Sequence, residues 1–168
     1  MTEQLSVQQM AERLCAAEDI LILCHKNPDG DTIGCASALC HALDALDKNA
    51  AVLCSDPIPE RYAYTAARLF KGDFEPRTII AVDVASIQLF GENNGMPQYT
   101  RHVDLCIDHH AGNSGYAEYT LLDGSAAAAA ELLYEVIRAM NVEITPHIAD
   151  CLYTGLSTDT GCFKFSST

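Results

Sequence analysis

Three short apolar runs in this sequence are each followed at once by an acidic or histidine side chain. The runs and the first polar residue after each are 21–24 with His25, 79–82 with Asp83, and 103–107 with Asp108. Short apolar runs bounded by turn residues are typical of strands in a covered parallel sheet. Ligands of such sheets bind beyond the carboxyl ends of the strands. The sequence therefore predicts that these polar side chains gather at one edge of a sheet.

Helical patterns alternate with the predicted strands. They occupy residues 6–17, 31–46, 61–70, 125–140 and 146–159, and further strands are expected at 50–54 and 117–122. Ser125 is the expected N-cap of the fourth helix, and the alanine run 126–130 is interpreted as close packing against the sheet. The alternation predicts a single α/β domain with a doubly wound, mainly parallel sheet and helices on both faces.

Composition narrows the class of protein. The 168 residues suffice for one domain with a substantial core, and no apolar stretch approaches the ~20 residues of a membrane-spanning helix. With no signal-peptide pattern at the N-terminus, we expect a cytoplasmic protein without a membrane partner. The eight cysteines form no Cys-x-x-Cys pair, so we expect them to be reduced and unligated.

The net charge of the chain limits the kind of partner that it can bind. Ten basic and 23 acidic residues give a net charge of −13, whereas a protein that grips a long polyanion is normally basic. Bound divalent cations would offset part of this negative charge. The balance argues against long duplex nucleic acid and leaves room for small phosphorylated substrates drawn in by metals.

The polar residues after the strands, with one acid near the chain's end, form a candidate metal set of two imidazoles and four carboxylates. Its members are His25, Asp29, Asp31, Asp83, His109 and Asp159. Oxygen and imidazole ligands without thiolate favour Mn²⁺ or Mg²⁺ over zinc, and the imidazoles favour Mn²⁺. So many carboxylates exceed the needs of one cation, which predicts a pair about 3.5–4 Å apart.

Each residue of this set also has an ordinary structural explanation. The loop with Asp29 and Asp31 is of a kind that caps helices. Asp83 alone would fit the end of a strand, and Asp159 alone would fit the C-terminal end of a helix. Only the whole set favours the metal interpretation.

Four motifs in order carry a family resemblance. They are His25-x-Asn-Pro-Asp-Gly-Asp31, the isolated strand-end Asp83, Asp108-His-His110, and Ser157-Thr-Asp-Thr-Gly161. Over residues 20–165 the chain resembles the DHH phosphoesterase family. The amino-acid sequences of its motifs are most similar to those of the nanoRNase/pAp-phosphatase group of bifunctional oligoribonucleases.

The resemblance implies a role for each residue. His25, Asp29 and Asp83 would hold one metal, while Asp31, Asp83, His109 and Asp159 would hold the other, with Asp83 bridging. His110 would face the scissile phosphate as a charge stabiliser or proton donor, and Asp108 would support it. Cys35 stands where the family commonly has serine. Members continue into a DHH-associated substrate domain, so residues 1–168 are expected to be the catalytic DHH domain alone.

The leading functional hypothesis is a two-metal hydrolase for short oligonucleotides and 3′-phosphoadenosine 5′-phosphate (pAp). Its expected cofactors are two Mn²⁺ ions, with Mg²⁺ or Co²⁺ as alternatives, and a homodimer is one option for its assembly. A family II-type inorganic pyrophosphatase and a cyclic dinucleotide phosphodiesterase are the enzyme alternatives. A module that binds metal or nucleotide without turnover is the alternative from another class.

Overall fold

A six-stranded, wholly parallel sheet forms the centre of the protein in the computed structural model, which describes residues 2–166 and 168. The strand order is β1-β6-β5-β4-β2-β3. The strands are β1 (Glu3–Gln4), β2 (Ile20–Leu23), β3 (Ala50–Leu53), β4 (Thr78–Val82), β5 (Leu105–Asp108) and β6 (Tyr119–Leu122). The protein has the predicted α/β fold.

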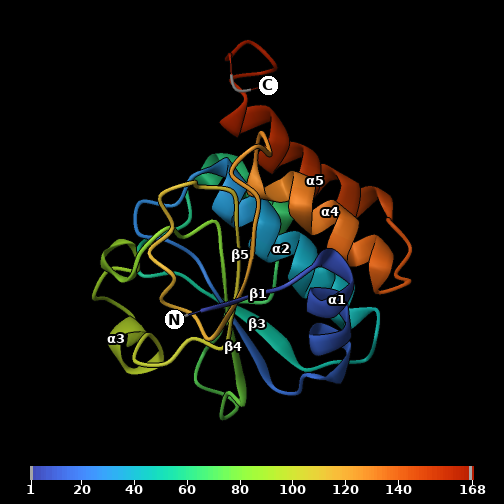
Figure 1. The fold of residues 1–168 in the computed structure, drawn as a ribbon. Coiled ribbons are helices and arrows are strands. Elements are labelled where there is room, and N and C mark those ends of the chain that lie inside the picture. Colours follow the sequence, from blue (N-terminus) through green and yellow to red (C-terminus); the bar gives the residue numbers. More distant parts are fainter. Residues whose placement is uncertain (1, 167) are drawn as a thin grey trace.

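Helices cover both faces of the sheet, but unequally. Four long helices pack on one face, and the short α3 lies on the other with the loops around it (Figure 1). The helices are α1 (Val7–Ala16), α2 (Gly30–Asp44), α3 (Met96–Tyr99), α4 (Ala129–Ala139) and α5 (Pro146–Asp159), with 3₁₀ turns η1 (Glu60–Thr65) and η2 (Ile87–Leu89). The strands therefore carry buried side chains on both sides.

Burial on both sides explains why the strands are apolar throughout. Along β2, Ile20 and Ile22 face the long helices, while Leu21 and Leu23 face the side of α3. All four side chains are fully buried. An unbroken apolar run is the expected pattern for a parallel strand covered on both faces. The polar residues that follow such strands are thus the first ones free to line an edge.

Helices α2 and α5 pack closely against each other, and glycine makes this possible. A Cβ added at Gly34 would lie 2.4 Å from the carbonyl oxygen of Cys151 and 2.9 Å from the backbone nitrogen of Gly155. A Cβ at Gly155 would lie 2.5 Å from Oδ1 of Asp31. Only the absence of both side chains allows the helices that carry Asp31 and Asp159 to come this near.

Two predicted elements are wrong. The helix expected at 61–70 is only the 3₁₀ turn η1, after which Ala66 takes a left-handed conformation with φ 42°. The chain then pairs with the outer edge of β3, because Val52 exchanges backbone hydrogen bonds of 2.8 and 2.9 Å with Arg68 and Phe70. The fourth helix begins at Ala129 and not at residue 125, because Ser125 bonds to Asp123 in a preceding turn.

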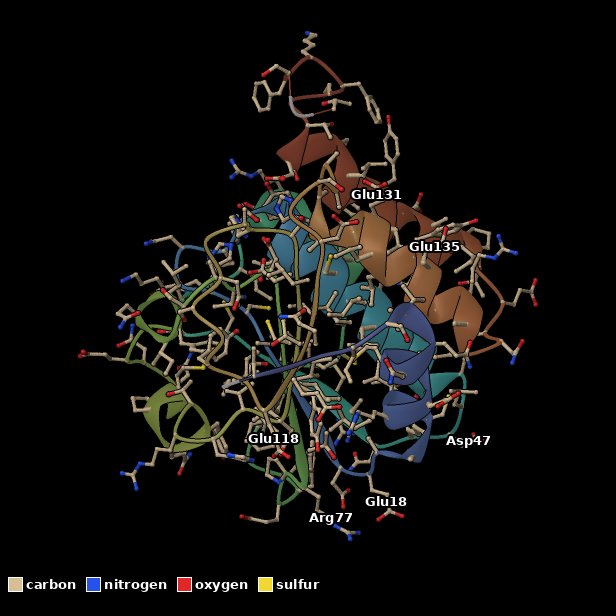
Figure 2. The ribbon with its side chains drawn as sticks, viewed as in Figure 1. Glu18, Asp47, Arg77, Glu118, Glu131 and Glu135 are labelled. Atoms are coloured by element: carbon tan, nitrogen blue, oxygen red, sulfur yellow. The ribbon has the colours of Figure 1, made fainter. Side chains whose placement is uncertain are left out.

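The surface is acidic over several elements, and no helix of residues 2–166 has the length and apolar character needed to cross a membrane. Glu131 and Glu135 project from α4, and Glu118 lies before β6 (Figure 2). Glu18 is exposed and pairs with Arg77. The excess negative charge is therefore distributed over the molecule rather than confined to one segment.

Candidate metal centre

The loop after β2 brings His25 and Asp29 together. The side chain of Asp29 caps α2 by accepting hydrogen bonds from the backbone N–H groups of Asp31 and Thr32, at 3.0 and 3.2 Å. Nδ1 of His25 is 2.8 Å from the carbonyl oxygen of Lys26. Because a carbonyl only accepts, Nδ1 carries the proton, and Nε2 faces Oδ1 of Asp29 at 3.5 Å with its lone pair free.

Asp31 is fully buried, and backbone groups from a distant helix surround it. Its Oδ2 accepts from the N–H of Ala129 at 2.7 Å, and its Oδ1 accepts from Ala130 at 3.1 Å. The thiol of Cys35 donates to Oδ1 at 3.3 Å. Cys35 therefore provides the hydrogen bond that a serine would provide. The alanine run does more than pack, because its backbone fixes this carboxylate.

Asp83 lies between the two halves of the site. It follows β4 with φ 57°, a left-handed conformation that is uncommon outside glycine and is enriched at functional sites. Its side chain is only 4% exposed. Oδ2 lies 3.7 Å from Nε2 of His25, and Oδ1 lies 3.6 Å from Nε2 of His109. One carboxylate thus faces both clusters.

The segment after β5 supplies two imidazoles of different environment. His109 is mostly buried, with Nδ1 3.1 Å from the carbonyl oxygen of Ala126, which leaves Nε2 directed at Asp83 and at Oδ2 of Asp159, 3.3 Å away. The side chain of His110 is 48% exposed, and its Nδ1 lies 2.8 Å from Oδ1 of buried Asp108. In both residues the bond at Nδ1 leaves Nε2 as the free nitrogen.

The expected residues form two adjoining groups of suitable ligand atoms. One consists of His25, Asp29 and Asp83, and the other of Asp31, His109 and Asp159; within each group the ligand atoms lie within 4.8 Å of one another. Asp83, His109 and His110 form a third, overlapping group. The structure brings all six expected metal ligands together, with His110 beside them and Asp108 behind His110.

Two buried ligand atoms in this centre have no hydrogen-bond partner among the residues that the structure describes. They are Oδ1 of Asp83 and Nε2 of His109. An unpaired buried polar atom costs roughly 1–3 kcal/mol, and these two face each other across 3.6 Å. A cation between them would satisfy both, so the residues present fit a divalent metal.

Electrostatics supports the same conclusion. Burial raises the pKa of Asp83 well above its usual value, and the charges of Asp31, Asp29, Asp108 and Asp159 raise it further. Burial also raises the pKa of Asp31 to about 6, although the N–H of Ala129 acts in the opposite direction. A cluster of carboxylates that resists ionisation in this way is stabilised by the positive charge of bound cations.

Sequence reasoning missed the residues that hold the ligands in place. Nδ2 of Asn113 donates to Oδ2 of Asp108 at 2.6 Å, and Oγ1 of Thr32 donates to the carbonyl of Val82, next to Asp83, at 3.0 Å. Asn113 lies five residues after Asp108 in a polar loop, where it carries no recognisable signal. The backbone donors of Ala129 and Ala130 have no side-chain signature at all.

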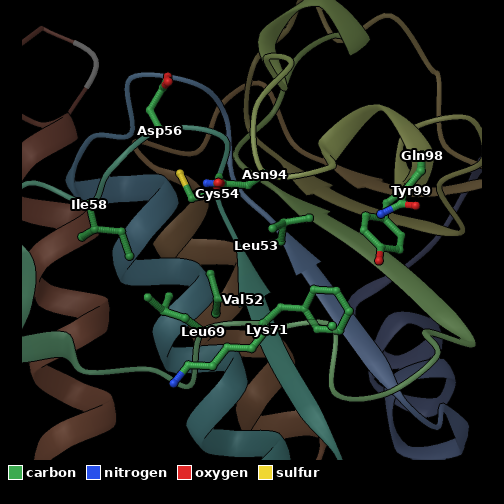
Figure 3. Close-up of a pocket in the computed structure, with 12 residues that line it drawn as sticks. Val52, Leu53, Cys54, Asp56, Ile58, Leu69, Lys71, Asn94, Gln98 and Tyr99 are labelled. Atoms are coloured by element: carbon green, nitrogen blue, oxygen red, sulfur yellow. The ribbon is translucent and has the colours of Figure 1, made fainter.

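A hollow of about 650 Å³ lies at the carboxyl end of β3, and none of the candidate ligands lines it (Figure 3). Val52, Leu53 and Leu69 contribute apolar walls, and aromatic rings and amide groups line other parts of it. It adjoins the first cluster because the thiol of Cys54, which lines it, contacts the carbonyl of His25 at 3.7 Å. Its volume is in the usual range of small-molecule sites.

Comparison with known proteins agrees with this geometry. Residues 19–156 match the DHH family, N-terminal domain. The bifunctional oligoribonuclease and PAP phosphatase NrnA of Thermus thermophilus is 35% identical over 167 residues, covering 95% of this chain and 49% of that protein. NrnA of Bacillus subtilis is 24% identical over 90% of this chain and 49% of that protein.

A solved structure has the same architecture. An exopolyphosphatase-related protein from Bacteroides fragilis superposes with a TM-score of 0.82 at 25% sequence identity, over 96% of this chain and 52% of that one. The chain thus spans about half the length of the relatives that it matches. From its family match and its 35% identity to the Thermus protein, the chain belongs to the DHH family.

Proposed function

We propose that this chain is the catalytic part of a two-metal, Mn²⁺-dependent phosphoesterase that hydrolyses short oligonucleotides and pAp. The observation that carries the proposal is the pair of buried, unpartnered ligand atoms, Oδ1 of Asp83 and Nε2 of His109. The names of the NrnA relatives support the choice of substrates. The chain spans about half the length of these relatives.

The two clusters would each hold one cation, with Asp83 shared. His25 and Asp29 would complete the first site, and Asp31, His109 and Asp159 the second. The two imidazoles favour Mn²⁺ over Mg²⁺. When bound, such a pair supplies positive charge for the phosphoryl group and lowers the pKa of a water molecule.

His110 is the proposed group for charge stabilisation or proton donation at the phosphate. The hydrogen bond to Asp108 raises the pKa of His110 and outweighs its partial burial, so protonation is easier than for a free imidazole. The remaining nitrogen, Nε2, is on the exposed side chain and can reach a substrate oxygen. Asp108 acts through His110 as a positioning residue, and Asn113 holds its other oxygen.

Charge and shape support a small substrate. The net charge of −13 and the exposed acids of α4 disfavour a long polyanion on this surface. The hollow at the end of β3 has room for a group larger than a phosphate, such as a nucleoside. We therefore place short oligonucleotides and phosphorylated nucleotides ahead of inorganic pyrophosphate.

The test is Mn²⁺-dependent phosphate or nucleotide release from four compounds: pAp, a dinucleotide, pyrophosphate and a cyclic dinucleotide. We expect release from the first two, and its loss in His110→Asn. His102→Asn is the matched control, because His102 also contacts an aspartate (Asp104, 3.1 Å) but lies outside the metal centre. Hydrolysis of pyrophosphate or the cyclic compound alone would replace our proposal with the corresponding alternative, and metal binding without any turnover would favour the non-catalytic module.

A further inference from the structure

A second cluster of metal-ligating side chains lies at the opposite ends of α2 and α5 from the candidate metal centre. It consists of His41 in the last turn of α2 and of His147 and Cys151 on α5. Each offers one ligand atom, and the three atoms lie within 4.8 Å of one another. Asp31 and His41 are ten positions apart on α2, or about 15 Å along the helix. The cluster is therefore separate from the centre described above.

The geometry of these side chains suits a metal. His147 and Cys151 are spaced i and i+4, so they project from the same face of α5. The rings of His41 and His147 lie edge to face with centroids 4.4 Å apart. Among residues 2–166 we find no hydrogen-bond partner for the His147 ring. Two imidazoles and a thiol thus converge from two helices on one place.

The thiol of Cys151 is only weakly hydrogen-bonded in this cluster. Nε2 of His41 and the thiol of Cys151 both point at one acceptor, the carbonyl oxygen of Thr65, at 2.9 and 3.8 Å. The longer contact is a weak hydrogen bond for a buried thiol. Burial raises the pKa of Cys151 to about 12, and the charge of Asp150 acts in the same direction. A cation would favour the thiolate and would be favoured by the nearby carboxylate.

We propose that His41, His147 and Cys151 bind one Zn²⁺ ion, which joins the ends of α2 and α5. Two imidazole nitrogens and one thiolate sulfur favour zinc over Mn²⁺ or Mg²⁺. Zinc takes the place of the Cys151 proton, which passes to solvent, and water or the Thr65 carbonyl completes the tetrahedron. Zinc–ligand bonds of about 2.0–2.3 Å can form once small side-chain rotations bring together ligand atoms that already lie within 4.8 Å of one another.

The assignment changes one expectation from the sequence, namely that all eight thiols are unligated. The structure supplies what spacing along the chain could not, because His41 is more than 100 positions from Cys151. Such a zinc would act on the helix pair that carries Asp31 and Asp159, the pair already in close contact at Gly34 and Gly155. Its role is to hold these helices together, and it takes no part in the phosphoryl chemistry.

The test is the zinc content of the purified chain, measured by mass spectrometry after dialysis against a weak chelator. To exclude zinc at the other centre, all proteins carry Asp83→Ala. We expect one equivalent of zinc in this background and its loss on adding Cys151→Ser. Cys40→Ser is the matched control and should retain zinc, because Cys40 is also a buried thiol that donates to a carbonyl (Ala50, 3.7 Å) but belongs to none of the metal-ligating groups.

A spectroscopic measurement keeps the proposal falsifiable if Cys151→Ser folds poorly. Co²⁺ added to the Asp83→Ala protein should give a thiolate-to-cobalt charge-transfer band, and Zn²⁺ should displace it. The band should persist in Cys40→Ser and disappear in His147→Gln. Absence of the band in the parent, or equal zinc content in the Cys151→Ser and Cys40→Ser proteins, would overturn the zinc site and would leave the proposed phosphoesterase function unaffected.

Discussion

At the level of single residues, hydrogen bonds to backbone groups hold several of the candidate metal ligands in place. The Nδ1 atoms of His25 and His109 are bonded to backbone carbonyls, and both oxygens of Asp31 are bonded to backbone N–H groups. Such contacts fix the tautomer and orientation of a ligand before any cation binds. The residue types were predictable from the sequence, but these supports were not, because most of them are backbone atoms.

Asn113 offers a test of how residues that contact no proposed metal ligand support His110. Replacing Asn113 with alanine removes its hydrogen bond to Oδ2 of Asp108 and frees the carboxylate that positions His110. A hydrogen bond to a charged group is worth about 1.5–3 kcal/mol, so we expect kcat to fall about ten- to hundredfold. Metal stoichiometry should be unchanged, because Asn113 contacts none of the proposed metal ligands. A loss of bound metal in this variant would show that Asn113 acts elsewhere.

The buried carboxylates predict how the metal-free protein responds to pH. The pKa of Asp31 is raised from 3.8 to about 6 in the folded state, so its stabilising effect is complete below about pH 4 and is lost as the pH rises through about 6. Asp83 shifts in the same direction. With metals removed by EDTA, the contribution of Asp31 to the free energy of unfolding in urea should fall by up to about 3 kcal/mol over this range. Asp29 and Asp108, whose pKa values are lowered, act in the opposite direction.

The control for this prediction is Asp31→Asn, which should flatten the fall with pH. Mn²⁺ should stabilise the unmodified protein more at pH 7 than at pH 5, because it binds the ionised carboxylates. An equal change of stability with pH in the metal-free parent and in metal-free Asp31→Asn would contradict this assignment.

Among the helices and strands, the sequence predicted those elements that are defined by the hydrophobic pattern of their own residues. The apolar strands and helices α1, α2 and α5 lie where their periodicity placed them, within a few residues. The helix expected at 61–70 does not form, because Arg68 and Phe70 pair with the edge of β3. A hydrophobic pattern within one segment cannot predict a contact with a distant strand. The start of α4 was misplaced because its first N–H groups bond to Asp31, about 98 positions away, and not to Ser125.

Close packing of α2 on α5 is open to a direct test through Gly34→Ala. In an open helix this change would stabilise by about 1 kcal/mol. Here the new methyl group would lie 2.4 Å from the carbonyl oxygen of Cys151, a backbone atom that cannot rotate away. We expect net destabilisation of about 1–3 kcal/mol in urea unfolding, with weaker metal binding because Asp31 and Asp159 are pushed apart.

Gly112→Ala is the matched change, since nothing lies within 4 Å of the added Cβ and its φ is not in the left-handed region. It should leave both stability and metal affinity near those of the parent. If Gly34→Ala were equally harmless, the close contact between the two helices would not be important for the centre.

At the scale of the whole molecule, the fold brings ligands from the ends of β2, β4, β5 and α5 to one place. The fold class and the convergence of the candidate ligands followed from the sequence, because polar residues at the ends of parallel strands share an edge. The second cluster at His41, His147 and Cys151 did not, because it depends on how two helices align.

The half-length match to the relatives leads to a prediction about turnover. We expect residues 1–168 to bind metals but to hydrolyse pAp slowly, and fusion to the C-terminal half of the Thermus relative to raise the rate without changing metal stoichiometry. The reason is that substrate contacts remote from the reacting phosphate position it for attack, and misplacement lowers the rate steeply. Equal rates of pAp hydrolysis by residues 1–168 and by the fusion would contradict the prediction that the second half positions the substrate.

If Asp83 is shared by two metal sites, Asp83→Ala should lose both metals, and the metal content of this variant tests the arrangement. The matched control is Asp19→Ala, which makes the same change at another aspartate of positive φ (46°, against 57° for Asp83) outside the centre. We predict that the parent and Asp19→Ala bind two Mn²⁺ ions per chain, that His25→Ala weakens mainly one, and that Asp83→Ala binds neither at concentrations that saturate the parent. Full Mn²⁺ occupancy in Asp83→Ala would contradict the shared site.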